Sequence, residues 1–324
     1  MLPAPIPEDD AQRLAELHAL GLLDSGSEPA FERVTRLAQR MFDVPIVLVS
    51  LIDKDRQWFS SNIGLDATET ARDISFCGHA IAGDDVFVVN DASQDERFAD
   101  NPLVEAGPKI KFYAGAPLRT PSGAALGTLC LIDGNSRQLT KYELDNLSDL
   151  AEIINGEIAH RCLANTDSLT GLLNRRGLFA AGSQLLAIAK REETPISLAY
   201  FDLDGLKAVN DSFGHRSGDD LICAAGRLLS NAVRASDVAS RLGGDEFAIL
   251  YYGLGEENFE QRHQRILDDL ERHNSSSVLD AQISFSVGYV EWSPDETLAD
   301  LLARGDAAMY RAKIGRKQST PDAA

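Results

Sequence analysis

The sequence predicts two folded domains, an α/β sheet domain followed by an α+β domain, joined by a helix. The chain has 324 residues, whereas typical domains contain roughly 100 to 200. Its hydrophobic share of 44% and charged share of 25% are typical of globular proteins. Helical and strand-like patterns alternate in two regions, and the segment 140–165 between them contains no Gly or Pro except Gly156. We therefore expect two hydrophobic cores and a linker helix.

The first region opens with a short amphipathic helix within residues 1–23. Leu14, Leu17 and Leu20 repeat at a spacing of three, and Gly21 is a typical helix end. A second helix is expected over 31–42. Four apolar, β-branched runs are expected to form strands: 44–53, 86–89, 112–118 and 124–132. These elements predict a sheet domain over residues 24–139.

The linker helix, residues 140–165, carries an apolar stripe at alternating spacings of three and four. Its members are Leu144, Leu147, Ala151, Ile154 and Ile158. Such a stripe suits either packing onto its own domain or a two-stranded coiled coil that would set the geometry of a dimer. The sequence leaves both alternatives open.

The second region, residues 166–324, alternates helices with strands. Helices are expected over 176–190, 217–234, 257–273 and 298–313, and strands over 196–202, 241–252 (a strand pair) and 282–290. The order predicts an antiparallel sheet with helices on one face, an α+β palm.

Composition argues against several classes of partner. The net charge of −19 argues against nucleic acid or an anionic membrane, because both need a basic surface. No run approaches the ~18 apolar residues of a membrane span, and the first residues lack the features of a secretion signal. The cysteines form no CxxC pair and are expected to be buried thiols: Cys77, Cys130, Cys162 and Cys223. We expect a cytoplasmic protein.

Two acidic motifs suggest a metal-dependent site. The apolar run 196–201 ends in Asp202, Leu203 and Asp204, and the letters GGDE at 243–246 lie between two strand-like runs, which indicates a hairpin turn. Carboxylates gathered at a strand end and a turn repel each other unless a cation lies between them. Mg²⁺ is bound by a few carboxylates plus substrate phosphates, and it supports phosphoryl transfer. The alternative for either motif alone is a set of solvated turn residues.

Several motifs over residues 164–324 together resemble the GGDEF family of diguanylate cyclases. They are DSLTGLLNRR at 167–176, FDLDGLKAVND at 201–211, FGHRSGDD at 213–220 and GGDEF at 243–247. The resemblance implies a palm-like domain that condenses two GTP into cyclic di-GMP and two pyrophosphates. It also implies Mg²⁺ or Mn²⁺ as the cofactor and a homodimer in which each protomer binds one GTP.

The resemblance also implies roles for individual residues. Metals would be held by Asp202, the Leu203 carbonyl, Asp245 and Glu246, and one of the last two would help to deprotonate the attacking 3′-hydroxyl. Phosphates would contact Lys207, Lys313, Arg316 and the turn at Gly243 and Gly244. Guanine would be read by Asn210 and Asp219, since a carboxylate accepts from guanine's ring N–H whereas adenine's ring nitrogen is an acceptor.

This chain departs from the family pattern at two places. Leu206 stands where the family usually has Phe. The segment AKIGRK at 312–317 is one residue shorter than the family's AKxxGRN spacing, which leaves the phosphate roles of Lys313 and Arg316 open.

A product-binding site is suggested by Arg234 and Asp237, an RxxD pattern in the register to GGDEF at which many family members bind cyclic di-GMP. Arginine can bind a phosphate with two hydrogen bonds, and aspartate can accept from a base edge. The alternative is a surface ion pair. The first reading implies inhibition by the product.

Residues 24–160 resemble GAF domains, which precede many bacterial signalling outputs. The resemblance rests on ISFCGHAI at 74–81, DASQDERF at 91–98, FYAGAPL at 112–118 and GTLCLID at 127–133. Candidate pocket residues are Cys77, His79, Asp91, Arg97 and Tyr113. For the first two, bilin attachment or metal binding competes with an ordinary core role, and for the others a pocket role competes with loop and edge-strand roles. A cyclic nucleotide, another metabolite and no ligand all fit.

Two rival functions follow from the same residues. One is a GGDEF domain without catalytic activity that binds GTP or cyclic di-GMP, although such domains usually carry a broken motif. The other is an interaction scaffold driven by the GAF domain.

Overall fold

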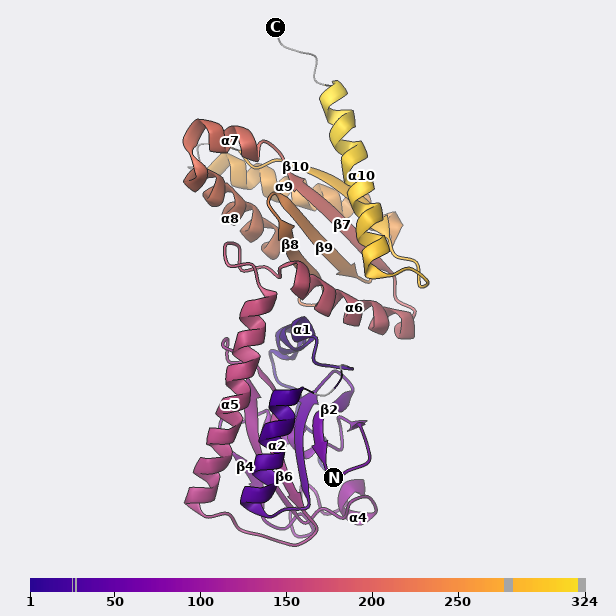
Figure 1. Ribbon diagram of the computed structural model, residues 1–324. Coiled ribbons are helices and arrows are strands. Elements are labelled where there is room, and N and C mark those ends of the chain that lie inside the picture. Colours follow the sequence, from indigo (N-terminus) through magenta and orange to yellow (C-terminus); the bar gives the residue numbers. More distant parts are fainter. Residues whose placement is uncertain (25, 27, 277–281, 320–324) are drawn as a thin grey trace. The chain divides into compact units, whose positions relative to one another are not determined.

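The computed structural model describes residues 1–24, 26, 28–276 and 282–319, with the side chains of 276 and 316–319 excepted. The chain divides into two compact units, Met1–Cys162 and Leu163–Ala324 (Figure 1). Each unit contains its own sheet and its own hydrophobic core. Across these described ranges, no helix combines the length and the apolar character that a membrane crossing requires.

The first unit is built on a six-stranded antiparallel sheet in the order β3-β2-β1-β6-β5-β4. Its strands are β1 (Ile46–Ile52), β2 (Arg56–Ile63), β3 (Glu69–Ala71), β4 (Phe87–Val89), β5 (Phe112–Arg119) and β6 (Ala125–Asp133). Its helices are α1 (Asp10–Leu20), α2 (Pro29–Phe42), α3 (Phe76–Ala80), α4 (Pro102–Glu105) and α5 (Lys141–Asn165). All four strand runs expected from the sequence are present, and Gly21 ends α1 in a left-handed conformation with φ 62°.

Both faces of this sheet are covered. Alternate β1 residues such as Val47 and Val49 pack with α1, α2 and α5, whereas Ile46 and Leu48 pack with α3 and the loops beyond it. Burial on both faces explains why every residue of β1 except Ser50 is apolar.

Helix α5 packs onto its own unit. Its apolar stripe lies in the core beneath α1 and α2, with Leu147, Ala151, Ile154 and Ile158 buried and Leu144 half-buried. A coiled-coil seam through Leu147 and Ile154 is therefore ruled out, because these side chains are already covered within the unit. Charged substitutions there would test folding and not dimerisation.

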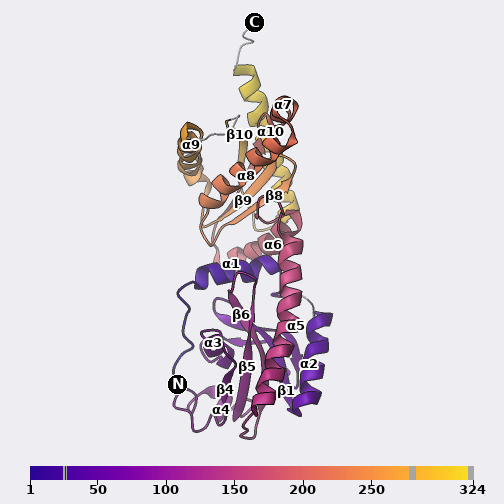
Figure 2. The ribbon, with the colours of Figure 1, turned by 90° about the vertical axis from the view of Figure 1, so that its left-hand side faces the viewer.

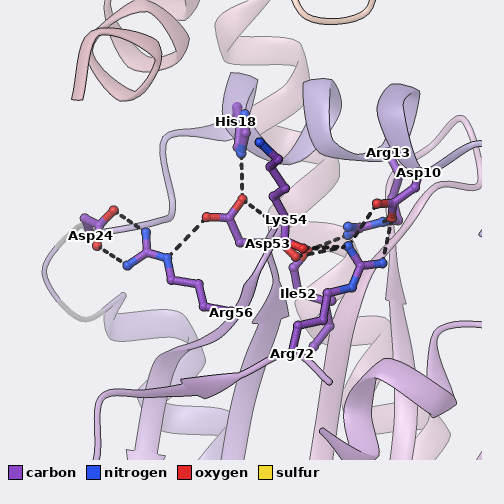
Figure 3. Close-up of polar contacts among 9 residues, drawn as sticks. All are labelled: Asp10, Arg13, His18, Asp24, Ile52, Asp53, Lys54, Arg56 and Arg72. Carbon is purple, nitrogen blue, oxygen red and sulfur yellow. Dashed lines mark hydrogen bonds and ion pairs between the residues drawn. The ribbon is translucent and has the colours of Figure 1, made fainter. Parts of the chain in front are cut away.

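Polar side chains fix α1 to the ends of β1 and β2 (Figure 3). Arg13, only 1% exposed, donates to the Ile52 carbonyl at 2.6 Å. His18 contacts the buried carboxylate of Asp53 at 2.9 Å, and Arg56 contacts the same carboxylate at 3.2 Å. Burial alone would raise the pKa of Asp53, but hydrogen bonds from His18, the Lys54 N–H and Arg56 hold it well below its usual range.

We expect Asp53→Asn to lower the free energy of local unfolding of α1 by on the order of 3 kcal/mol at pH 7, because a buried ion pair loses one partner. The pKa of Asp53 is lower in the folded protein than in the unfolded chain, where it is about 3.9, so the ionised carboxylate stabilises the folded state above about pH 3.9. This stabilisation is lost as the pH falls below about 3.9 toward the folded-state pKa. The difference from wild type should therefore shrink below about pH 4. Hydrogen exchange of peptides from α1 measures it. Equal protection of α1 in both proteins at pH 7 would contradict the stabilising role of this carboxylate.

The second unit contains a four-stranded antiparallel sheet in the order β10-β7-β9-β8, whose strands are labelled in Figure 1. Figure 2 shows the same unit turned by 90°. Its strands are β7 (Ile196–Leu203), β8 (Val238–Gly243), β9 (Glu246–Tyr252) and β10 (Phe285–Glu291). Its helices are α6 (Arg175–Glu192), α7 (Leu206–Phe213), α8 (His215–Asn231), η1 (Glu256–Asn258), α9 (Phe259–Ser276) and α10 (Leu298–Ser319).

Helices cover both faces of this sheet, so the expectation of helices on one face was wrong. Helices α6 and α10 pack on the side of Leu198 and Tyr200, and α7, α8 and α9 pack on the side of Ala199 and Phe201. The physical reason lies in β7, whose residues are all buried and which needs cover on both sides.

Candidate active site

The acidic residues of the two sequence motifs lie where β7 ends beside the β8–β9 turn. Asp202 pairs with Glu246 across β7 and β9, and the Leu203 N–H donates to the Asp245 carbonyl at 2.8 Å. Gly243 and Gly244 have φ of 149° and 53°, conformations that disfavour residues with a Cβ. These glycines therefore allow the tight turn that places Asp245 and Glu246 beside the end of β7.

Asp202 and Asp204 have different surroundings. Asp204 accepts hydrogen bonds from Ser284 at 3.1 Å and Ser286 at 2.9 Å, which tie the end of β7 to β10 and the residues before it. Asp202 lies instead on the face covered by α10, where its Oδ1 is 2.6 Å from the Lys313 Nζ. Hydrogen bonds from two serines thus hold Asp204, whereas Asp202 contacts the Lys313 ammonium.

The pKa values follow from this arrangement. Burial raises the pKa of Asp202, the Lys313 ammonium opposes that rise, and the charges of Asp245 and Asp204 add to it. The hydrogen bond to Asp202 raises the pKa of Lys313, so Lys313 stays charged. Among the described residues, the charges of Asp202, Asp204 and Asp245 act on the Lys313 ammonium.

The donor set fits a hard divalent cation that takes some of its ligands from a nucleotide. Carboxylates from β7 and the turn, with the Leu203 carbonyl, supply oxygen ligands of the kind Mg²⁺ prefers. Within residues 1–24, 26, 28–276 and 282–319, no three Asp, Glu, His or Cys side chains converge closely enough to enclose an ion by themselves. Phosphate oxygens would have to complete the coordination.

Tyr200 is a site residue that the sequence analysis missed. It lies two residues before Asp202 on the same face of β7 and pairs with Ala248, which places it diagonally across from Glu246. Burial raises its pKa, and the nearby charges of Glu246 and Asp306 raise it further, so the hydroxyl stays protonated as a donor toward Glu246. The alternation of β7 was the signal that could have identified it.

Asn210 and Asp219 lie on neighbouring helices, α7 and α8. The Asn210 Oδ1 is buried and lacks a hydrogen-bond partner in the described part of the chain, whereas Asp219 is exposed. Gly218 permits this packing, because a Cβ there would lie 1.9 Å from the Asn210 Oδ1. An unsatisfied acceptor beside an exposed carboxylate suits a ligand that donates hydrogen bonds. The expected helix over 217–234 captured α8, but α7 was not expected.

Of the basic residues expected to contact phosphates, the structure describes the side chains of Lys207 and Lys313 but not that of Arg316. Lys207 is exposed on α7, and Lys313 points back to Asp202 from α10. Arg316 belongs to the last turns of α10, and its side chain lies outside the described residues.

Arg234 and Asp237 do not form a side-chain ion pair with each other. Arg234 is exposed, whereas Asp237 is buried and accepts hydrogen bonds from the backbone N–H groups of Arg234 at 2.9 Å and Tyr252 at 3.1 Å. Burial raises the pKa of Asp237, and the two N–H groups oppose this. Asp237 therefore closes the turn before β8, and only Arg234 extends into solvent.

The GAF pocket candidates separate into two groups. Tyr113 and Cys77 meet in the core, where the Tyr113 hydroxyl donates to the Cys77 sulfur at 3.2 Å and Cys130 lies 3.7 Å from the same sulfur. Burial would raise the pKa of Cys77, but its hydrogen bonds, first that with Cys130, lower it. These contacts form a buried polar cluster on the α3 side of the sheet.

The remaining candidates have partners nearer the surface. The His79 ring contacts the Leu2 carbonyl at 3.2 Å, and Asp91 accepts hydrogen bonds from Ser93. The Arg97 side chain forms two hydrogen bonds with Asp95, and its guanidinium carbon lies 4.8 Å and 5.3 Å from the ring centres of Phe87 and Phe98. Each of these side chains is thus engaged locally.

Comparison with known proteins agrees with this arrangement. The domain family described as "Diguanylate cyclase, GGDEF domain" matches residues 164–319, and the GAF domain family matches residues 27–158. The fold and the carboxylate turn define a palm-type domain preceded by a sensory-type sheet domain. The chain belongs to the GGDEF family and carries a GAF domain ahead of its GGDEF domain.

Relatives differ in their named activities. A cyclic di-GMP phosphodiesterase of Pseudomonas aeruginosa is 44% identical over 177 residues, covering 54% of this chain and 30% of that protein. The diguanylate cyclase DgcP of Escherichia coli is 32% identical over 228 residues, covering 65% of this chain and 67% of that protein. The chain thus spans less than a third of the first relative and two thirds of the second.

Among solved structures, the coiled coil and GGDEF domain of DgcB from Caulobacter crescentus, in complex with c-di-GMP, is similar. It is 27% identical, with a TM-score of 0.47, and the match covers 53% of this chain and 92% of that one.

Proposed function

We propose that this protein is a diguanylate cyclase, which condenses two GTP into cyclic di-GMP and two pyrophosphates. The observation that carries the proposal is the pairing of Asp202 with Glu246 beside an intact GGDEF turn. The unpartnered acceptor of Asn210 beside Asp219 supports a ligand that donates hydrogen bonds, as guanine does. A relative named as a diguanylate cyclase supports the same reaction.

In the proposed reaction, the 3′-hydroxyl of one GTP attacks the α-phosphate of the other, twice. Asp245 or Glu246 accepts the hydroxyl proton, while Lys207, Lys313 and Arg316 contact the phosphates. Mg²⁺ or Mn²⁺, held by Asp202, the Leu203 carbonyl, Asp245 and Glu246, would neutralise charge that develops on the phosphates. Each palm binds one GTP, so two protomers must face each other.

The experiment is incubation of the full chain with GTP and Mg²⁺, followed by chromatographic identification of the products. We expect cyclic di-GMP and pyrophosphate in a ratio of about one to two, from the stoichiometry of two phosphodiester bonds. Recovery of bound but unreacted GTP would instead identify a binding domain. Because one relative is named a phosphodiesterase, added cyclic di-GMP should be assayed for hydrolysis in parallel.

We further propose that a ligand of the GAF domain regulates the cyclase. The match of residues 27–158 to the GAF domain family supports a sensory role for this unit. The protein would act in the cytoplasm, where GTP is available.

We also propose that cyclic di-GMP inhibits the enzyme through Arg234. Arg234→Ala should raise the inhibitory concentration of cyclic di-GMP at least about tenfold, equivalent to ~1.4 kcal/mol, because it removes a planar cation matched to the product's phosphates. Calorimetric binding of cyclic di-GMP measures this. Arg227→Ala, on the exposed side of α8, is the control.

Asp237→Ala is not a clean test of the same site, because its carboxylate holds two backbone N–H groups. Equal affinity of wild type and Arg234→Ala for cyclic di-GMP would remove Arg234 from product binding.

A further inference from the structure

Lys313 occupies a special place in the site. Its Nζ lies 2.6 Å from the Asp202 Oδ1, with side chains 30% and 10% exposed respectively. The charges of Asp204 and Asp245 also act on this ammonium. The amine therefore lies within the carboxylate group from which a divalent cation would take its ligands.

An ammonium and a metal ion compete for the same oxygen atoms. Lysine offers three donors but only one positive charge, so it can neutralise one carboxylate but cannot also offset the charge of a bound phosphate. A divalent cation can do both, and it binds carboxylates together with substrate phosphates. Two cations close to one carboxylate oxygen repel each other strongly in a partly buried site.

We propose that Lys313 holds the cation position at Asp202 while no nucleotide is bound, and thereby prevents free divalent metal from binding there. Arriving GTP brings its metal and offers phosphates to the ammonium, which leaves Asp202 for them. Metal uptake is thus coupled to nucleotide binding. This inference rests on the proposed function, because it takes GTP as the ligand.

The length of α10 supports the proposed movement of the Lys313 ammonium from Asp202 to the phosphates. Lys313 lies in the part of α10 beyond the buried Leu301, Leu302 and Met309, and it is flanked by the exposed Ile314. Its flexible stem can therefore swing without disturbing the core that anchors the helix. Lys313 is the cation that the described part of the chain places at Asp202.

The test measures Mn²⁺ binding by electron paramagnetic resonance, with the full-length protein and no nucleotide. Lys313→Gln should bind Mn²⁺ at least about tenfold more tightly than wild type. Lys313→Arg, which keeps the charge, should stay close to wild type. Lys190→Gln on α6, whose amine contacts only the Pro294 carbonyl at 3.0 Å in the described structure, is the matched control and should not change.

The measurement is repeated with 3′-deoxy-GTP, which lacks the attacking hydroxyl. Lys313→Gln should then no longer bind Mn²⁺ more tightly than wild type, because in wild type the phosphates have drawn the ammonium away from Asp202. Equal Mn²⁺ affinity of wild type and Lys313→Gln without nucleotide would overturn the inference, even if cyclic di-GMP is formed. If Lys313→Gln bound Mn²⁺ more tightly but the wild-type protein formed no cyclic di-GMP, only the proposed function would be contradicted.

Discussion

Asp245→Ala should abolish formation of cyclic di-GMP while the second unit stays folded. The turn that we propose holds the metal loses a carboxylate, and the expected cost is several kcal/mol of transition-state stabilisation, at least about a hundredfold in rate. The backbone contact between the Leu203 N–H and the Asp245 carbonyl, 2.8 Å long, does not depend on the side chain. Glu246→Ala should lose activity to a similar extent and keep its backbone pairing with Asp202.

Initial rates at saturating GTP and Mg²⁺ measure the effect, and circular dichroism checks the fold. Asp268→Ala on α9 removes a carboxylate whose described contact is with Gln264, and it should retain full activity. If Asp245→Ala or Glu246→Ala turned over within a few-fold of wild type, the assignment of metal ligands to this turn would be wrong.

The sequence was most informative where function and geometry coincide. The sequence contains a strand that ends in acidic residues and a glycine turn that is followed by two more acidic residues. This pattern predicted neighbouring carboxylates, and the pairing of β7 with β9 brings Asp202 and Glu246 into register. Glycine at 243 and 244 was equally informative, since the backbone there has positive φ.

Contacts between distant residues were harder to predict. Lys313 and Asp202 are 111 residues apart, and nothing in the local pattern of α10 indicates which carboxylate its amine meets. Strand β2 was not expected, because RQWFSSNI mixes polar residues into a strand whose Ser60 and Ser61 are buried in the folded unit. The spacing of Asp237 suggested a role in product binding, but it did not indicate that the carboxylate accepts hydrogen bonds from two backbone N–H groups.

Helix α7 was missed for a related reason. The segment between β7 and α8 was interpreted by its family motif, so the periodicity of 206–213 was not assigned to a helix of its own. Gly214, with φ 87°, separates α7 from α8 and lets the two helices pack side by side. This packing places Asn210 beside Gly218, so the pair that we propose reads guanine depends on an element that the pattern alone did not predict.

The preference for GTP over ATP should depend on Asp219. Guanine donates from its ring N–H and its exocyclic amine, whereas adenine presents an acceptor at the same ring position. Asp219 is exposed on α8 and directly follows Gly218, against which the unpartnered Asn210 Oδ1 lies. A site built to pair such donors rejects the analogue that lacks them by roughly 10⁴-fold. Wild type should therefore make cyclic di-GMP and almost no cyclic di-AMP.

Asp219→Ser should lower this preference at least about a hundredfold, equivalent to ~2.7 kcal/mol, by removing the carboxylate that repels adenine and attracts guanine. The ratio of kcat/KM for GTP and ATP measures it, and the reacting carboxylates are untouched by the change. Asp220→Ser removes an exposed carboxylate from the next position of the same helix, so it should keep the wild-type ratio. If both variants changed the ratio equally, general charge and not base reading would explain the preference. If wild type itself accepted ATP as readily as GTP, Asp219 would have no role in reading guanine.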